Sequence, residues 1–501
     1  MGPACETVFG AIVAGRRPLD NPTTASLAPL ADSVQVAEMK GMGDGVTTFR
    51  RREVLGALLG LAGAALVPGR HAAALELPAI PLAPTRRPEP GLVEIAVDAA
   101  PARLAVAGRT AELWTYGGGF PGRMLRVREG ETVRLRFANR LPEATNLHFH
   151  GLHIPPTGRA DNVWLHVMPG ETFDYEFTVP EGDAGTHWYH PHLHGRIARQ
   201  MWAGLAGPLI VDGPIDALPE LAAADERIVV LKDLGLVDGR PPPHGAMDWH
   251  KGKEGDLVLV NGAVTPRLRA TAGSVRLRLI NACNARYFRL GLEDGRPWHL
   301  IATDGHYLER PQELDDLLLV PGARADVLIP LERSEEVRLR HLFYDRRTPD
   351  FTPERTLLTI VPRVGARPLP LPERLAGVPR LRPEHAVARR RITMAMFLLN
   401  GQPFDPNRID IAGRLGDLEL WEVENVGTMD HPFHIHTWYF QVATRNGRAA
   451  PFPAWRDTVN LRPGDRLELL VPLRSYTGRS LYHCHVAEHG DKGMMGVVEV
   501  T

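Results

Sequence analysis

An alternation of apolar and polar residues recurs three times along this chain. One such phrase runs from Gly130 to Asn139, a second from Gly273 to Asn281 and a third from Gly416 to Asn425. Apolar residues at every second position place one face of a strand in a core and leave the charged residues in water. The three glycines are 143 residues apart in both intervals. This regular spacing predicts related strands in three parts of the chain.

A second phrase, a Pro-Gly turn followed by a strand that ends in proline, repeats with a similar spacing. It covers residues 169–180, 321–330 and 463–472. Two independent phrases with a common period of about 145 residues predict three tandem copies of one β domain. Short strands between turn signals, with little helical periodicity, favour an all-β fold of sandwiches or small barrels.

The repeats also predict how the chain is divided. A leader covers residues 1–74, and the first copy covers 75–214. The second copy covers 215–362, a linker rich in proline and arginine follows over 363–391, and the third copy covers 392–501.

Composition excludes some classes of partner and some ways of stabilising the fold. The 501 residues carry a formal net charge of −1, so the basic excess that nucleic-acid binding requires is missing. The 49 glycines and 44 prolines agree with many turns between short strands. The three cysteines, Cys5, Cys283 and Cys484, are too few for a disulfide framework, so the fold depends on its core.

The leader has the pattern of an export signal. Arginines at positions 50–52 precede an apolar run from Val54 to Val67, which is shorter than the roughly 20 residues that span a bilayer. Small residues follow, with a cleavage site near Ala74. This pattern is typical of a twin-arginine signal peptide, and a membrane anchor is the alternative. We expect the twin-arginine export machinery as a partner, a periplasmic or secreted mature protein, and no stable membrane anchor after cleavage. Met39 or Met42 is a candidate start, because the arginines lie far from the first residue.

Histidines are the chemically informative residues. Four His-x-His pairs occur in the first and third copies: His148/His150, His190/His192, His434/His436 and His483/His485. Residues two apart on a strand point to the same side, so each pair can offer two imidazoles to one place. The corresponding part of the second copy has only His341. We therefore expect a cluster of several metal ions shared between copies one and three, although imidazole alone does not identify the metal.

Cys484 indicates copper. It lies between His483 and His485, so its thiolate faces the opposite side of the strand. His431, His489 and Met494 lie nearby in the sequence. Two imidazoles, a thiolate and a weak thioether form the ligand set of a blue-copper electron-transfer site. An electron could then pass from Cys484 through its chain neighbours to the cluster.

Other histidines and the remaining cysteine of the predicted domains receive ordinary roles. His153, His166, His187 and His194 do not follow the pair spacing, and we interpret them as supporting or ordinary residues. Cys283 is interpreted as a buried apolar thiol.

Together these motifs resemble the four copper signatures of multicopper oxidases. The likeness rests on residues 148–151, 188–192, 431–436 and 483–494, and it is greatest to bacterial three-domain laccases and copper-efflux oxidases. The resemblance implies three cupredoxin-like Greek-key domains and four copper ions. It also implies oxidation of a reductant coupled to four-electron reduction of O2 to water.

The resemblance assigns the ligands by motif. A type 1 copper would be held by His431, Cys484, His489 and Met494. A type 2 copper would be held by His148 and His434. A type 3 pair would take His150, His190 and His485 on one ion, and His192, His436 and His483 on the other. Cys484, His483 and His485 would also carry the electron, and Met495 is the alternative to Met494.

Proton supply is where the chain departs from the family pattern. The family places a carboxylate on each side of the cluster, and Asp161 fits one of them, with a turn residue as the alternative. The second is usually a glutamate directly after the later type 1 histidine, but here that position is Gly490. Water or Asp491 is the candidate replacement.

The sequence leaves two candidate reductants open, an organic compound and Cu(I). Copper-efflux members carry a methionine-rich segment that collects Cu(I), but the candidate region 344–349 has no methionine, and only Met394, Met396 and Met429 are expected nearby. This favours a laccase-type oxidase of phenols and aromatic amines, with a periplasmic cuprous oxidase as the alternative. A copper-free structural protein of the cell envelope is a remote alternative, because the ligands are all present. A two-domain nitrite reductase is disfavoured by the three repeats.

Overall fold

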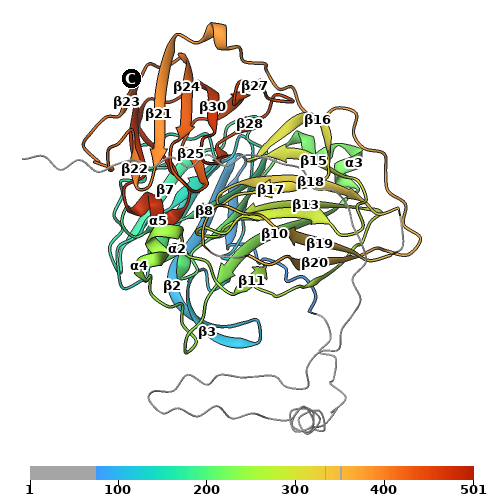
Figure 1. Ribbon diagram of the computed structural model, residues 1–501. Helices are drawn as coiled ribbons and strands as arrows, with labels where there is room; N and C mark the ends of the chain where they lie inside the picture. The colour runs from blue at the N-terminus through green and yellow to red at the C-terminus, as the bar shows by residue number, and fades with distance from the viewer. Residues whose placement is uncertain (1–74, 333–334, 350–351) are drawn as a thin grey trace, which may run out of the picture. The chain divides into compact units, whose positions relative to one another are not determined.

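The computed structural model describes residues 75–332, 335–349 and 352–501. Strands dominate these residues, and the helices among them are short (Figure 1). The described strands form six sheets, and each predicted copy contributes two of them. No helix in this part of the chain has the length and apolar character needed to cross a membrane.

The first copy contains one helix, α2, and nine strands among its described residues. They are β1 (Thr85–Glu89), β2 (Leu92–Val106), β3 (Arg109–Tyr116), β4 (Leu125–Arg128), β5 (Thr132–Asn139), β6 (His148–His150), β7 (Thr172–Thr178), β8 (Gly185–His190), α2 (Ile197–Trp202) and β9 (Gly207–Asp212). One sheet has the order β1-β2-β5-β7 with β3 beside β2, and the other has the order β4-β9-β8-β6. Apolar side chains of both sheets, such as Phe137 and Phe149, are buried in one core.

The second copy has the same two-sheet plan. Its elements are η1 (Pro214–Ala217), α3 (Pro219–Ala222), β10 (Asp225–Leu234), α4 (Ala246–Lys251), β11 (Leu257–Val260), β12 (Arg267–Arg269), β13 (Ser274–Asn281), β14 (Phe288–Leu292), β15 (Trp298–Thr303), β16 (His306–Leu314), β17 (Leu317–Leu319), β18 (Arg324–Pro330), β19 (Val337–Leu342) and β20 (Arg355–Val361). The sheet orders are β11-β10-β13-β18-β15-β16 and β12-β20-β19-β14-β17.

The third copy follows a short 3-10 turn. Its elements are η2 (Pro383–His385), β21 (Ala388–Ala395), β22 (Leu398–Leu399), β23 (Ile411–Gly413), β24 (Leu418–Asn425), β25 (His431–Ile435), β26 (Phe440–Arg445), β27 (Arg448–Ala449), β28 (Trp455–Arg456), β29 (Thr458–Leu461), β30 (Arg466–Pro472), β31 (Gly478–Cys484), α5 (Ala487–Asp491) and β32 (Met495–Val500). One sheet has the order β22-β21-β24-β30-β26-β27 with β28 beside β26, and the other has the order β23-β32-β31-β25-β29.

The repeated phrases occupy equivalent strands in the three copies. The first phrase forms β5, β13 and β24, and the second forms β7, β18 and β30. In every copy the first phrase pairs parallel with an earlier strand and antiparallel with the second phrase. The all-β prediction of three related domains is therefore confirmed, while the domain boundaries stay a prediction.

An asparagine at the end of the first phrase fixes the following loop in each copy. The Asn139 side-chain amide donates to the carbonyl oxygens of Glu143 and Val167, both at 2.8 Å. Asn281 and Asn425 donate to two carbonyls in the same way. Because a buried amide must be satisfied, these bonds select one loop conformation. In copies one and three that loop leads to the first metal-ligand motif.

Three short helices from the three copies lie beside one another. Helix α5 contacts both α2 and α4 (Figure 1). The Asp491 carboxylate at the end of α5 accepts the backbone N–H groups of Gly195 at 2.7 Å and Ala198 at 2.8 Å. Burial raises the pKa of Asp491 to about 7. This carboxylate therefore joins copy three to copy one, and its two oxygens are used for that contact.

The core of the second copy offers a test of the fold that leaves the metal ligands untouched. Leu277 on β13 is fully buried, whereas Val364 is 91% exposed. Leu277→Ala is expected to lower the free energy of unfolding by about 2–5 kcal/mol, because it removes buried contacts and leaves a cavity. Val364→Ala is the control and is expected to change little. Urea unfolding followed by tryptophan fluorescence measures both, and equal midpoints for the two variants would contradict this packing.

Candidate metal centre

Two pairs of adjacent strands bring the His-x-His motifs together. In copy one, β6 pairs with β8 so that His148 lies opposite His190. In copy three, β25 pairs with β31 so that His434 lies opposite His483. His436 and His485 follow directly after their strands, and His192 lies two residues after the end of β8. We call the eight residues the histidine cage: His148, His150, His190, His192, His434, His436, His483 and His485. All eight are buried.

Three cage histidines converge on one point. The Nε2 atom of His483 lies 3.2 Å from Nε2 of His192 and 3.0 Å from Nε2 of His436. The Nδ1 atom of His483 lies 2.9 Å from the Cys484 carbonyl oxygen, which fixes the ring. The same three residues were assigned to one type 3 ion from the sequence, and the structure brings their ligand atoms together.

The other predicted type 3 set, His150, His190 and His485, is not one of the close groups among the described residues, where His150 and His190 lie with His148 instead. Nε2 of His485 lies 3.3 Å from Nδ1 of His150. Nε2 of His150 lies 3.2 Å from an Asp457 oxygen, so Nδ1 is the atom left for a metal. The His190 ring centroid is 5.7 Å from that of His485. His190 Nδ1 contacts the Pro191 carbonyl, which turns Nε2 inward.

His148 and His434, the predicted type 2 pair, are each held through Nδ1 by a contact to the protein. Nδ1 of His148 lies 2.9 Å from the Asp161 carboxylate, and Nδ1 of His434 lies 2.9 Å from the Asp457 carbonyl oxygen. Both Nε2 atoms lack a hydrogen-bond partner within the described residues. Close groups of ligand atoms also join His148 to His150 and His190. The cage is thus continuous, and the division of its ligands among individual ions stays a prediction.

The electrostatics of the cage fit a bound metal. Burial lowers the pKa of His148, His150 and His483 well below its ordinary value, and the neighbouring imidazoles lower the pKa further. These rings are therefore neutral at pH 7, the form that donates a lone pair to a metal. Buried nitrogens without a partner, including Nε2 of His190, would be costly unless an ion occupied the space between them. Imidazole donors suit copper, as they also suit zinc, iron and nickel, and Cys484 is what indicates copper.

A second group of ligands lies on the other side of strand β31. The Cys484 sulfur is 3.5 Å from Nδ1 of His431 and 3.7 Å from Nδ1 of His489. Nε2 of His489 lies 3.0 Å from the His250 carbonyl oxygen on α4, which orients the ring. These three residues form a further group of close ligand atoms. Two imidazoles and one thiolate are three of the ligands that would hold copper in a blue-copper site.

The packing around Cys484 is compatible with Met494 as the fourth residue that would hold a type 1 copper. Met494 is fully buried in the same apolar cluster as Cys484. Met495 lies in a different cluster, with Trp188. Its terminal carbon lies about 3.7 Å from where a side chain at Gly490 would begin, on the cage side of α5. The predicted role of Met494 is therefore compatible with the packing.

Strand β31 connects the two groups of ligands. His483 and His485 belong to the histidine cage, while the intervening Cys484 faces His431 and His489. This alternation follows from the two-residue period of a strand. It provides the short covalent path between the sites that the sequence predicts.

Asp161 lies at the cage and is not only a turn residue. Its carboxylate contacts His148 Nδ1 and accepts the backbone N–H of Phe149 at 2.9 Å. Burial raises the pKa of Asp161 to about 7. A carboxylate with this pKa can hold or release a proton near neutral pH.

Gly490 occupies the position where the family usually has the second proton-donating carboxylate, and the structure places no other carboxylate of the described residues there. A side chain beginning at Gly490 would meet only ordinary contacts, with His483 Nδ1 at 4.0 Å. Asp491 is bound to the amides of α2 and does not take this place. Glu488, two residues before Gly490, is buried and accepts hydrogen bonds from Asn284 and His244, each at 2.9 Å.

Three supporting residues around the cage were not predicted from the sequence. Asp457 contacts His150 and forms a two-bond ion pair with Arg324 at 2.7 and 2.8 Å. Burial alone would raise the pKa of Asp457, but the nearby Arg324 and His150 hold this pKa well below its ordinary value. Gly322 has φ +85°, and a side chain there would overlap the His485 ring. Arg324 and Gly322 belong to the second copy, which therefore supports the cage without donating ligands.

The remaining histidines and Cys283 lie outside the groups of close ligand atoms found among the described residues. His153 contacts the Thr437 carbonyl oxygen at 2.6 Å, and His187 contacts the Asp183 carbonyl oxygen at 2.9 Å. His166 and His194 are exposed. Cys283 is buried in the core of the second copy.

Comparison with known proteins agrees with this geometry. Residues 99–215, 232–337 and 378–501 each match a multicopper oxidase domain family. The multicopper oxidase mco of Staphylococcus aureus is 32% identical over 397 residues, which cover 77% of this chain and 83% of that protein. Cell division protein FtsP of Escherichia coli is 32% identical over 429 residues, which cover 79% of this chain and 86% of FtsP.

Solved structures show the same fold. A multicopper oxidase from Campylobacter jejuni, described as a metallo-oxidase, aligns with a TM-score of 0.79 and 31% identity over 85% of this chain and 95% of that one. A laccase from Pediococcus acidilactici aligns with a TM-score of 0.77 and 31% identity over 85% and 94%. The fold and the donor set define a class of copper-binding oxidoreductases built from tandem cupredoxin-like domains. This chain belongs to the multicopper oxidase family, whose members use copper and O2.

Replacing the Cys484 thiolate is an experiment that distinguishes the two predicted copper sites. Cys484→Ser is expected to abolish the intense visible absorption of a copper–thiolate bond, because Cys484 is the sulfur ligand between His431 and His489. The histidine cage should still bind copper, since none of its residues is changed. Absorption spectroscopy and copper analysis of the loaded protein measure the two outcomes. Cys283→Ser is the matched control and should keep the colour; loss of colour in that variant alone would contradict the assignment.

Proposed function

We propose that this protein is a laccase-type oxidase. It takes single electrons from phenols or aromatic amines at the Cys484 site and passes them to the histidine cage. Four such electrons and four protons convert one O2 to two molecules of water. The observation that carries this proposal is strand β31, where Cys484 contacts one ligand group while His483 and His485 belong to the other.

Copper, when bound, supplies the one-electron redox chemistry and the site of O2 reduction. The four ions that the resemblance implies remain part of this proposal. The chain's own residues hold the rings in place: the carbonyls of His250 and Asp457 orient His489 and His434. Burial keeps bulk water from the cage, and Asp161 supplies protons beside His148. The neutral imidazoles keep their lone pairs available for the ions.

The surroundings of the Cys484 site favour an organic reductant. The segment 344–349 contains no methionine, and it packs against the third copy through Tyr344, whose hydroxyl donates to Asp430 at 2.5 Å. The Phe397 ring lies 5.8 Å from the His489 ring. An aromatic neighbour beside an electron-accepting histidine suits a flat phenol. The related multicopper oxidase from Ochrobactrum is described as acting on lignin model compounds.

Oxidation of Cu(I) is the second candidate, and one observation favours it. Met247 on α4 is 57% exposed, and the same helix supplies the His250 carbonyl that contacts His489. Met429, two residues before His431, is buried. Thioethers are soft ligands that prefer Cu(I). The related enzyme of Campylobacter jejuni is described as a metallo-oxidase.

A structural role such as the name of FtsP suggests is disfavoured by chemistry. A protein without copper would have no reason to bury a complete set of neutral imidazoles with unpartnered nitrogens. Copper therefore remains part of the proposal.

We also propose that the protein works in the periplasm or outside the cell. The twin-arginine signal that supports this lies outside the described residues, as do both candidate start methionines. Sequencing the N-terminus of the exported protein tests it: cleavage near Ala74 is expected, and an intact leader on mature protein would contradict it.

Asp161→Asn tests the proton supply. The amide can still contact His148 but cannot release a proton, so O2 uptake should slow by at least about ten-fold while the blue colour remains. Oxygen-electrode rates and visible spectra of the copper-loaded variant measure both. Asp174→Asn, which changes an exposed carboxylate, is the control. Unchanged O2 uptake in Asp161→Asn would remove Asp161 from the mechanism.

Substrate choice is tested by O2 uptake with a methoxyphenol and, separately, with chelator-buffered Cu(I). Fast uptake with the phenol, unaffected by Met247→Ala, is the expected result for a laccase-type enzyme. Uptake dominated by Cu(I) and weakened in Met247→Ala would make the second candidate correct. Absence of uptake with both, in protein that has bound copper, would contradict the oxidase proposal altogether.

A further inference from the structure

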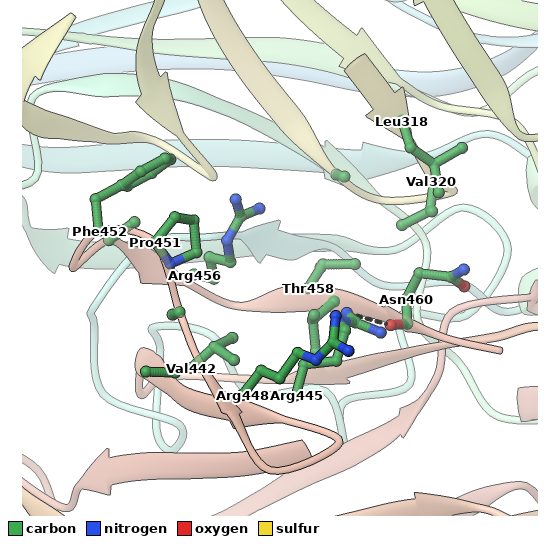
Figure 2. A pocket seen from close by; sticks show the side chains of 15 residues that line it. Leu318, Val320, Val442, Arg445, Arg448, Pro451, Phe452, Arg456, Thr458 and Asn460 are labelled. Carbon is green, nitrogen blue, oxygen red and sulfur yellow. Dashed lines mark hydrogen bonds between the residues drawn. The ribbon is translucent and has the colours of Figure 1, made fainter. Parts of the chain in front are cut away.

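A cavity of about 440 Å³ lies between the second and third copies. Strand β17 and the residues just before β18 form one side, and the segment from β26 to β29 forms the other (Figure 2). Its walls are largely apolar, with Leu318 and Val320 from copy two facing Val442, Pro451 and Phe452 from copy three. Pockets of this size and lining are typical of sites for small organic molecules.

Three arginines also line this cavity, and within the described residues two of them make no side-chain hydrogen bond or ion pair. Arg445 donates to Asp465 at 2.5 Å. It also donates to the Asn460 carbonyl at 2.8 Å (Figure 2). Neither Arg448 nor Arg456 has a side-chain hydrogen bond or ion pair to any residue in the described part of the chain. The cavity therefore holds two guanidinium groups whose donors are free.

The charge of Arg456 is poorly compensated by the protein. Arg456 is half-buried, and burial lowers the pKa of its guanidinium despite the negative charges of Asp304 and Asp457. Both of those carboxylates contact Arg324 instead. A partly buried guanidinium with free donors favours an incoming anion, because a carboxylate can accept two parallel bonds from it.

We propose that this cavity binds a small organic carboxylate with a flat apolar body, such as an aromatic acid. The carboxylate accepts hydrogen bonds from Arg456 and Arg448, and the body packs against Phe452 and Val320. This site is separate from the proposed oxidase activity and does not depend on it.

The floor of the cavity places the occupant near the histidine cage. Thr458 lines the cavity, and its hydroxyl lies 3.2 Å from His434 Nδ1 and donates to Asp457 at 2.7 Å. Arg456 and Thr458 flank Asp457 in the chain. The proposed carboxylate site therefore lies close to Asp457, which contacts His150 and His434.

Isothermal titration calorimetry on the copper-loaded protein tests the site, with benzoate as the probe. Benzyl alcohol keeps the ring without the charge, and inorganic phosphate keeps charge without the ring. Saturable binding of benzoate is expected, with both comparison probes weaker by about ten-fold or more. Arg456→Gln and Arg448→Gln should each weaken benzoate binding by about ten-fold. Arg414→Gln, which changes an exposed arginine elsewhere in copy three, should leave it unchanged.

Three results would overturn the proposal. The first is no saturable heat with benzoate. The second is unchanged affinity in both Arg448→Gln and Arg456→Gln, which would place benzoate elsewhere, including on a copper ion. The third is phosphate binding as tight as benzoate binding, which would make the apolar wall irrelevant. Because Arg448 is exposed and lies on a short surface strand, its variant remains informative even if Arg456→Gln does not fold.

Discussion

The structure depends on one constraint: eight imidazoles from two separate copies share a small, buried space. Such a group cannot be charged, because burial and mutual repulsion lower the pKa of rings such as His148 and His436 far below neutrality. It also cannot be satisfied by hydrogen bonds alone, since several nitrogens lack partners in the described chain. Metal ions resolve both difficulties at once. The three-copy architecture serves to bring two pairs of strands close enough for this to happen.

The second copy shows how a domain can support a site without donating to it. Its Pro-Gly turn, which is only a turn in the sequence, places Gly322 directly against the His485 ring. Two residues later, Arg324 forms a buried ion pair with Asp457, which contacts His150 in turn. Removing one partner of such a pair leaves an uncompensated charge in the interior, so these contacts hold the three copies in one arrangement around the cage.

Features that repeat along the chain could be predicted, and features that depend on tertiary contacts could not. The 143-residue spacing predicted strands β5, β13 and β24, and the His-x-His pairs predicted which strands bring the buried histidines together. Asp161 could not be separated from a turn residue, because its contact with His148 spans a loop. Asp457 and Arg324 lie in no motif and are 133 residues apart, so only the folded chain relates them. The free guanidinium groups of Arg448 and Arg456 are visible only once the cavity between two copies is formed.

The most direct test of the central claim is anomalous diffraction at the copper absorption edge from crystals of the copper-loaded protein. The account predicts a cluster of copper peaks enclosed by the eight cage histidines and one separate peak beside Cys484, between His431 and His489. Copper found only beside Cys484, or only on the protein surface, would contradict it. In that case the buried imidazoles would not be a metal centre, and the oxidase chemistry assigned to them would fail.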